Sequence, residues 1–125
     1  MQITLYGIPN CDTVKKARAW LAAQGIAYRF HDVKKDGVTR ALLAAWVDAA
    51  SWEALVNRRG TTWRGLSEER RNAIVDADSA IALMAASPSV IKRPVLAARG
   101  LVHVGFSADM YAQIFGGAAR VGENS

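Results

Sequence analysis

The chain has 125 residues, 51% of them hydrophobic, which is enough for one domain with a buried core. Its formal net charge of +5 suits an anionic partner, but the basic residues lie in small scattered clusters, which argues against nucleic acid. No apolar run is long enough to span a bilayer, the N-terminus lacks the pattern of a secretion signal, and a single cysteine cannot close an internal disulfide, so we expect a cytoplasmic protein with no membrane partner.

The first part of the chain predicts a β-α-β unit. Apolar and polar residues alternate over residues 3–6, which is typical of a strand. Apolar residues then repeat at helical spacing from Val14 to Leu21, and Gly25 is expected to end this helix. Residues 26–31 predict a second strand, which should run parallel to the first through a right-handed crossover.

Residues from about 38 to 87 predict a block of helices, which we interpret as a lobe inserted into a smaller α/β core. Three of these helices are expected to begin after residues whose side chains can cap a helix, namely Thr39, Ser51 and Ser67. Asp78 is expected to begin the next helix, which should end before Pro88. Residues 57–65 contain two glycines and no periodicity, and therefore predict a loop.

The last part of the chain predicts a β-hairpin and a helix. Residues 95–98 and 101–104 are apolar runs around a two-residue turn that contains glycine. Ser107 is expected to cap the last helix. The element order indicates an α/β fold in which helices flank a mixed sheet. We expect residues 1–116 to form a single domain and residues 117–125 a flexible tail.

The cysteine of this chain, Cys11, lies where the first strand turns into the first helix. A helix N-terminus presents unpaired N–H groups and a partial positive charge, which favour a thiolate. Lys15 and Arg18 act in the same direction, whereas Asp12 opposes them. A free cysteine is often a small buried hydrophobe, but strand-to-helix turns lie at the sheet edge where ligands bind. Cys11 is therefore a candidate nucleophile.

Four segments resemble the arsenate reductase-like family, a thioredoxin-fold group that includes ArsC, Spx and YffB proteins. Residues 6–17 (YGIPNCDTVKKA) resemble its catalytic turn, and residues 57–64 (NRRGTTWR) resemble its arginine loop. Residues 91–96 (IKRPVL) resemble the Arg-Pro stretch that enters the hairpin, and residues 100–106 resemble its hairpin tail. The resemblance covers about residues 1–116 and implies a thioredoxin-like α/β fold.

The resemblance also implies roles for individual residues. It makes Cys11 the nucleophile and gives Arg93 the task of holding an anionic group near the sulfur. Arg58 or Arg59 would contribute from the arginine loop, and we favour Arg59. Pro94 would be the cis proline beside the thiol. Arginine suits this task because its planar fork donates two parallel hydrogen bonds to a carboxylate or an oxyanion.

Three departures from the family pattern favour one branch of the family. One-cysteine arsenate reductases carry an arginine after the hairpin, but residues 102–106 contain none, and Gly7 stands where those enzymes have a histidine. Spx regulators, which bind RNA polymerase, commonly have a second cysteine where this chain has Val14. The resemblance therefore implies a glutathione-dependent thiol reductase of the YffB type. An Spx-like regulator and a glutaredoxin-coupled arsenate reductase are the alternatives.

The cysteine count sets the chemistry that this chain can perform. A thiolate that attacks a disulfide or an oxidised arsenic centre is left in an adduct, and a second thiol must resolve it. With one cysteine, that thiol must come from glutathione, glutaredoxin or another chain. We expect glutathione as co-substrate, no bound cofactor, and a disulfide or an anionic small molecule as substrate. The carboxylates of glutathione suit Lys15, Arg59 and Arg93.

The other candidate site residues each have two possible roles. Asn10 would cap the helix, which we favour, or contact substrate. Thr13 would hydrogen-bond the sulfur or stabilise the first turn, and Lys15 would lower the thiol pKa or lie in solvent. His31 and His103 have no second ligand at metal spacing, so no metal site is predicted.

Overall fold

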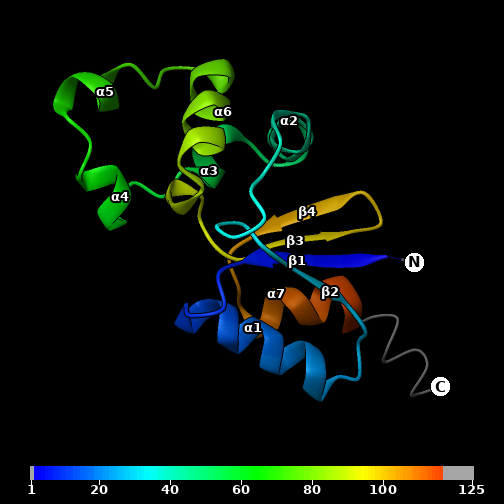
Figure 1. The fold of residues 1–125 in the computed structure, drawn as a ribbon. Helices are drawn as coiled ribbons and strands as arrows, with labels where there is room; N and C mark the ends of the chain where they lie inside the picture. The colour runs from blue at the N-terminus through cyan, green and yellow to red at the C-terminus, as the bar shows by residue number, and fades with distance from the viewer. Residues whose placement is uncertain (1, 117–125) are drawn as a thin grey trace.

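A four-stranded mixed sheet, with the strand order β2-β1-β3-β4, carries helices on both of its faces (Figure 1). The computed structural model describes residues 2–116. The elements are β1 (Ile3–Gly7), α1 (Asp12–Ala23), β2 (Arg29–Asp32), α2 (Arg40–Ala49), α3 (Trp52–Leu55), α4 (Thr61–Arg64), α5 (Glu68–Asn72), α6 (Ala77–Ala86), η1 (Pro88–Val90), β3 (Val95–Ala98), β4 (Leu101–Val104), α7 (Ala108–Tyr111) and η2 (Ala112–Gly116).

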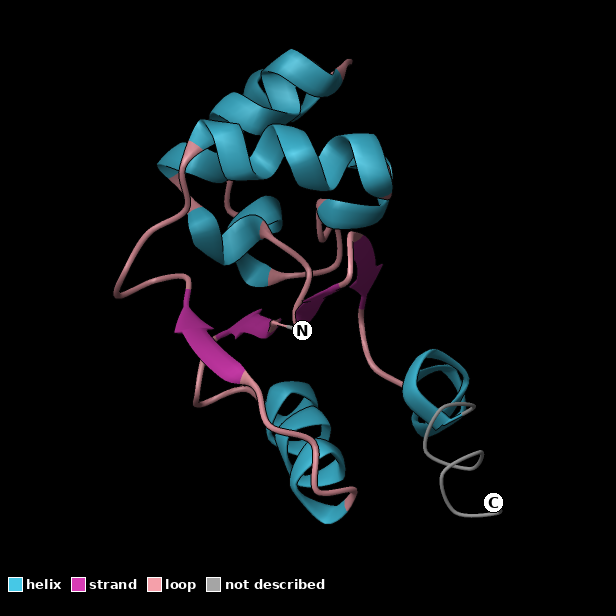
Figure 2. Cartoon of the chain, turned by 90° about the vertical axis from the view of Figure 1, so that its right-hand side faces the viewer, coloured by secondary structure: helices cyan, strands magenta, loops and turns pink. Residues whose placement is uncertain are grey.

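The sheet has the predicted mixed topology. Strand β1 pairs in parallel with β2, and α1 provides the crossover between them. Strand β3 pairs antiparallel with both β1 and β4, so the two inner strands run in opposite directions. Helices α1 and α7 cover one face and α2–α6 gather over the other, a separation that is also visible after a turn of 90° (Figures 1 and 2). The predicted thioredoxin-like α/β fold is confirmed.

The two faces of the sheet build two separate hydrophobic clusters, because successive side chains of a strand point to opposite faces. Leu5 and Leu96 are 0% exposed and pack on the side of α1 and α7. Their neighbour Val95 points the other way, into the cluster that also contains Trp46 and Met84 of the helices above the sheet. Burial of both faces stabilises the central strands.

The predicted helix caps are confirmed at three positions, where a side-chain oxygen accepts a backbone N–H three residues later, at Thr39, Ser51 and Ser67. The predicted start of α6 at Asp78 is wrong, since the helix begins at Ala77 with Asp76 as its cap. The Asp76 carboxylate accepts the Ser79 N–H at 2.9 Å, and the Ser79 hydroxyl accepts the Asp76 N–H at 3.1 Å. This reciprocal pair satisfies two helix-end donors, which fixes the boundary.

The second strand starts at Arg29 rather than at Ile26 as predicted. The Ile26 N–H donates to the Leu21 carbonyl at 3.0 Å, so it closes the end of α1 instead of joining the sheet. Gly25 ends the helix as predicted, with φ of +69° that a residue without a side chain adopts at little cost.

The segment 57–65, predicted as a loop, contains the one-turn helix α4. The Arg64 N–H donates to the Gly60 carbonyl at 3.1 Å, which closes a turn that has no hydrophobic periodicity to announce it. The hairpin of β3 and β4 and the Ser107 cap of α7 are confirmed. The predicted tail, residues 117–125, lies outside the described residues. Within residues 2–116, no helix has both the length and the apolar character needed to cross a membrane.

Gly7 is the last residue of β1, just before the turn that carries Cys11, and its surroundings leave no room for a side chain. A Cβ at this position would lie 2.8 Å from Cγ2 of Val14, which is 0% exposed. We expect Gly7→Ala to lower the free energy of unfolding by about 1–3 kcal/mol, the usual cost of overpacking. Urea unfolding of both single variants and of the double variant with Val14→Ala measures their coupling. Strictly additive effects would contradict the predicted contact.

Candidate active site

Strand pairing brings three distant segments to the same edge of the sheet. Tyr6, near the end of β1, pairs with Val95 at the start of β3, and Val95 pairs with Val104 at the end of β4. Because β3 runs antiparallel to both neighbours, the chain that leaves β1, the chain that enters β3 and the chain that leaves β4 all lie at this edge. Cys11 and Arg93 belong to the first two of these segments.

Cys11 itself is the residue that precedes α1. Its backbone is extended, with φ of −111° and ψ of 128°, and the helix starts at Asp12. The Cys11 N–H donates to the Ile8 carbonyl at 3.2 Å, and its carbonyl accepts the Lys15 N–H at 2.9 Å. The prediction that Asn10 caps the helix is wrong, because Cys11 takes the cap position and Asn10 lies one residue outside, exposed.

The surroundings of the sulfur favour the thiolate. Partial burial by itself raises the pKa of Cys11, but hydrogen bonding from the backbone of Val14, from the side chain of Arg93 and from the backbone of Thr13, together with the positive charge of Arg93, lowers it overall. The thiol is also partly exposed to solvent. Cys11 therefore combines the two properties of a reactive cysteine, a low pKa and access to solvent.

Arg93 is held in place before it meets any ligand. Its Nη1 donates to the carbonyl of Ser89 at 2.9 Å and to that of Ile91 at 3.4 Å. Its Nε is buried and, among the residues that the structure describes, has no hydrogen-bond partner. The peptide bond between Arg93 and Pro94 is cis, as predicted. Arg93 thus holds a positive charge in a fixed position and acts on the Cys11 thiol by hydrogen bonding and by its charge.

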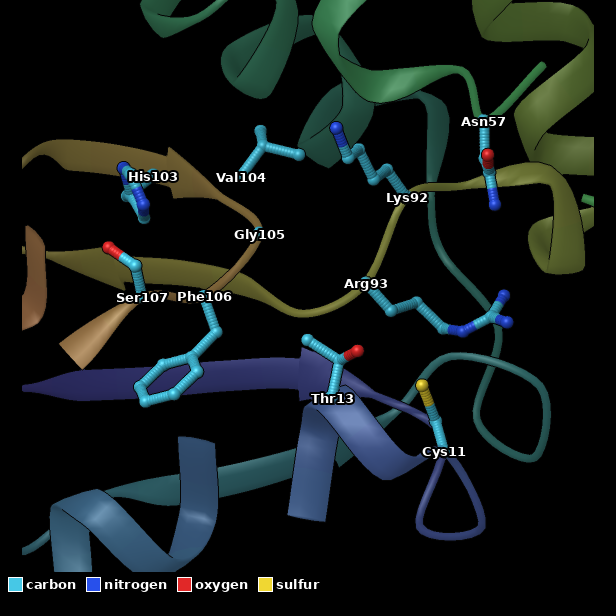
Figure 3. A pocket seen from close by; sticks show the side chains of 10 residues that line it. All are labelled: Cys11, Thr13, Asn57, Lys92, Arg93, His103, Val104, Gly105, Phe106 and Ser107. Atoms are coloured by element: carbon cyan, nitrogen blue, oxygen red, sulfur yellow. The ribbon is translucent and has the colours of Figure 1, made fainter. Parts of the chain in front are cut away.

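Cys11 and Arg93 share a cavity of about 520 Å³ (Figure 3). Besides these two residues, it is lined by Thr13, Asn57, Lys92, His103, Val104, Gly105, Phe106 and Ser107. Among residues 2–116, no group of three or more His, Cys, Asp or Glu side chains is placed to hold a metal ion. The cavity brings the thiol of Cys11 together with two cationic side chains, Arg93, which is fixed, and Lys92, which is exposed.

Several predicted residues lie elsewhere. Thr13 lines the cavity, but Lys15 and Asn10 are exposed and do not. Arg58 and Arg59 do not line it either, but line a neighbouring cavity of about 450 Å³. Within the described structure, Arg93 is thus the arginine that lines the cavity of the thiol.

The neighbouring cavity meets the first one at Asn57 and Lys92, which line both. The Arg58 guanidinium lies 5.7 Å from the ring centres of Trp52 and Trp63, and this cation–π stacking holds it away from the sulfur. The backbone N–H of Arg59 donates to the Asn57 side-chain oxygen at 3.1 Å. The two cavities thus share Lys92, and Arg58 and Arg59 add two cations to the second one.

The sequence did not single out Asn57, Lys92 or residues 104–107 as part of the site. Asn57 and Lys92 nevertheless lie within two of the segments that resemble the family, residues 57–64 and 91–96, so the sequence had pointed to their neighbourhood. Residues 100–106 were noted as the hairpin tail that lacks the arginine of the arsenate reductases, and the antiparallel pairing of β3 with β4 brings the end of this tail to the cavity. His103, weighed above as a metal ligand, lines the cavity, and burial lowers its pKa, so it is uncharged at neutral pH.

Comparisons with known proteins agree with this geometry. A solved structure of a YffB protein superimposes with a TM-score of 0.85, at 48% identity, over 90% of this chain and 97% of that one. An arsenate reductase (ArsC) related protein from Brucella melitensis is 50% identical over 92% of this chain and 95% of its own, with a TM-score of 0.72.

Curated sequences give the same relationship. An uncharacterized protein of Haemophilus influenzae is 42% identical over 113 residues, which are 90% of this chain and 98% of that protein. The global transcriptional regulator Spx of Streptococcus agalactiae is 24% identical over 109 residues, 86% of this chain and 78% of that regulator. The model of the ArsC family matches residues 6–114. The chain therefore belongs to the ArsC family.

Proposed function

We propose that this protein is a thiol–disulfide reductase in which Cys11 is the nucleophile and glutathione resolves the adduct. The observation that carries the proposal is a partly exposed thiol of lowered pKa that shares a cavity with a fixed arginine. The thiolate is the species that attacks a disulfide, and a lowered pKa increases the fraction of Cys11 in that form.

The reaction has two exchange steps. In the first, the Cys11 thiolate attacks one sulfur of a disulfide, the S–S bond breaks, and the other half leaves as a thiolate that takes a proton from solvent. In the second, the thiolate of glutathione attacks the mixed disulfide on Cys11 and regenerates the Cys11 thiolate. This first pass releases one half of the substrate as a thiol and the other half as its mixed disulfide with glutathione. In a second pass, Cys11 attacks the glutathione sulfur of that mixed disulfide, the remaining half leaves as a thiol, and a second glutathione releases oxidised glutathione from Cys11. Over both passes the substrate gains two electrons, which two glutathione molecules supply. The chain has one cysteine, so the resolving thiol comes from outside it.

The basic side of the site suits the carboxylates of glutathione. Arg93 acts on the thiol through a hydrogen bond and its charge, Lys92 lines the same cavity, and Arg58 and Arg59 line the neighbouring cavity together with Lys92. We assign Arg59 to a glutathione carboxylate rather than to the reacting sulfur. Glu53 also lines the neighbouring cavity and repels a bound anion. Attraction of a carboxylate there therefore depends on the three cations of that cavity, Arg58, Arg59 and Lys92.

The same geometry ranks the two alternatives lower. A small oxyanion is held best by several converging cations, but residues 103–107 carry no fixed charge. A switch based on an internal disulfide requires a second cysteine, which this chain lacks.

A coupled assay tests the proposal. The protein is mixed with bis(2-hydroxyethyl) disulfide, glutathione, glutathione reductase and NADPH, and NADPH oxidation is recorded. We expect consumption that rises with protein concentration and requires glutathione. A parallel reaction with arsenate, with and without glutaredoxin, measures the arsenate reductase alternative. Turnover of arsenate without turnover of the disulfide would contradict the proposed reaction.

A further inference from the structure

The cavity around Cys11 has two sides that differ in charge (Figure 3). Arg93 and Lys92 come from the chain that enters β3 and supply the cationic side of the cavity, where the Arg93 side chain lies next to the sulfur and that of Lys92 points away from it (Figure 3). Residues 103–107, from the end of β4 to the start of α7, form the facing side and include no lysine, arginine, aspartate or glutamate. The cavity is therefore polarised, with Cys11 on its cationic side.

The uncharged side is built on a buried aromatic cluster. The ring of Tyr111, which is 0% exposed, lies edge-on to Phe106 at 4.7 Å and to His103 at 5.9 Å between centres. The Gly105 N–H donates to the Pro94 carbonyl at 2.8 Å, which ties this side to the segment that carries Arg93. Packing of this kind holds the rings in fixed positions, so the uncharged side is a preformed surface.

A disulfide substrate extends in two directions from its sulfur atoms, so its two halves can meet the two sides of the cavity. We infer that the substrate is a mixed disulfide between glutathione and an uncharged, apolar or aromatic thiol, with the glutathione half on the cationic side and the uncharged half against residues 103–107. This inference rests on the proposed function and adds the class of substrate to it. A carboxylate on the second half would lose hydration against this surface without gaining a charged partner among residues 103–107.

The arrangement also defines which bond changes. The Cys11 thiolate attacks the sulfur of the glutathione half, so a disulfide forms between Cys11 and glutathione. The uncharged thiol leaves as a thiolate and takes a proton from solvent. A second glutathione thiolate then attacks the glutathione sulfur on Cys11, which releases oxidised glutathione and restores the Cys11 thiolate.

A matched pair of substrates tests the inference. The mixed disulfides of glutathione with benzyl thiol and with 4-(mercaptomethyl)benzoate differ by one carboxylate on the second half. We expect kcat/KM at pH 7.5, measured with glutathione as the reductant, to be about tenfold higher for the benzyl compound, which corresponds to about 1.4 kcal/mol. Equal values, or a preference for the carboxylate, would overturn the inference and leave the proposed function standing. Absence of turnover with both compounds would overturn the proposed function.

Two variants locate the preference on the uncharged side. Phe106→Ala should lower kcat/KM for the benzyl compound several-fold, whereas Phe115→Ala should not, because Phe115 packs on the same Tyr111 ring but does not line this cavity. His103→Arg should raise kcat/KM for the carboxylate compound by placing a cation on that side. An unchanged substrate ratio in both Phe106→Ala and His103→Arg would assign the preference elsewhere and overturn the placement.

Discussion

The Cys11→Ser variant is expected to lose the protein-dependent part of glutathione-coupled disulfide reduction completely. A serine hydroxyl is not ionised at neutral pH and cannot form a disulfide, so no adduct can be made. Intact-mass measurement after treatment with oxidised glutathione should show one glutathione adduct on the wild-type chain and none on the variant. This is the prediction with the largest effect, because Cys11 is the single thiol of the chain.

The fold of the variant provides the control for this loss. The Cys11 side chain is partly exposed and belongs to neither hydrophobic cluster, so thermal unfolding of Cys11→Ser should resemble that of the wild type. Protein-dependent turnover in a folded Cys11→Ser variant would show that the reaction does not pass through this sulfur.

Replacement of Arg93 by alanine is expected to raise the pKa of the Cys11 thiol and to slow turnover about 100-fold at neutral pH, as is typical when one charged donor is removed from a reacting group. Arg93 lowers this pKa both by hydrogen bonding and by its charge. The rate of alkylation against pH should have its midpoint below about 8.5 in the wild type, and at a higher pH in Arg93→Ala. The variant retains the contribution of the backbone N–H groups.

Two further arginine variants sharpen this test. Arg93→Lys keeps the charge but loses the fork that binds the carbonyls of Ser89 and Ile91, so its midpoint should lie between the other two. Arg64→Ala removes an exposed arginine that does not line the cavity, and its midpoint should equal that of the wild type. An alkylation midpoint that is the same in Arg93→Ala and wild type would remove Arg93 from the activation of the thiol.

The lowered pKa also predicts the sign of a stability effect. The folded protein holds the thiol proton less tightly than the unfolded chain, so ionisation of Cys11 stabilises the fold at pH values above the ordinary thiol pKa. This contribution is lost as the pH falls through the lower pKa of the folded state. The difference in unfolding free energy between the wild type and Arg93→Ala should therefore grow as the pH rises through that range.

Much of the local structure could be predicted because it depends on neighbouring residues. Thr39 and Ser51 cap their helices with their own side chains, and Gly25 ends α1 with its own positive φ. The predicted start of the second strand was wrong because a backbone N–H there had two possible hydrogen-bond acceptors. Ile26 could join the sheet or close α1, and its N–H bonds Leu21. Such choices depend on packing that local sequence does not report.

The sequence by itself determined that Cys11 is the one thiol, which made it the candidate nucleophile and made the proposed reaction dependent on a thiol from outside the chain. Only the tertiary structure decided which cations surround the sulfur. Arg93 reaches the cavity of Cys11 because β3 pairs antiparallel with β1, whereas Arg58 stacks on two tryptophans and lines the neighbouring cavity. The physical reason is that these positions follow from strand pairing and ring packing between segments far apart in the chain.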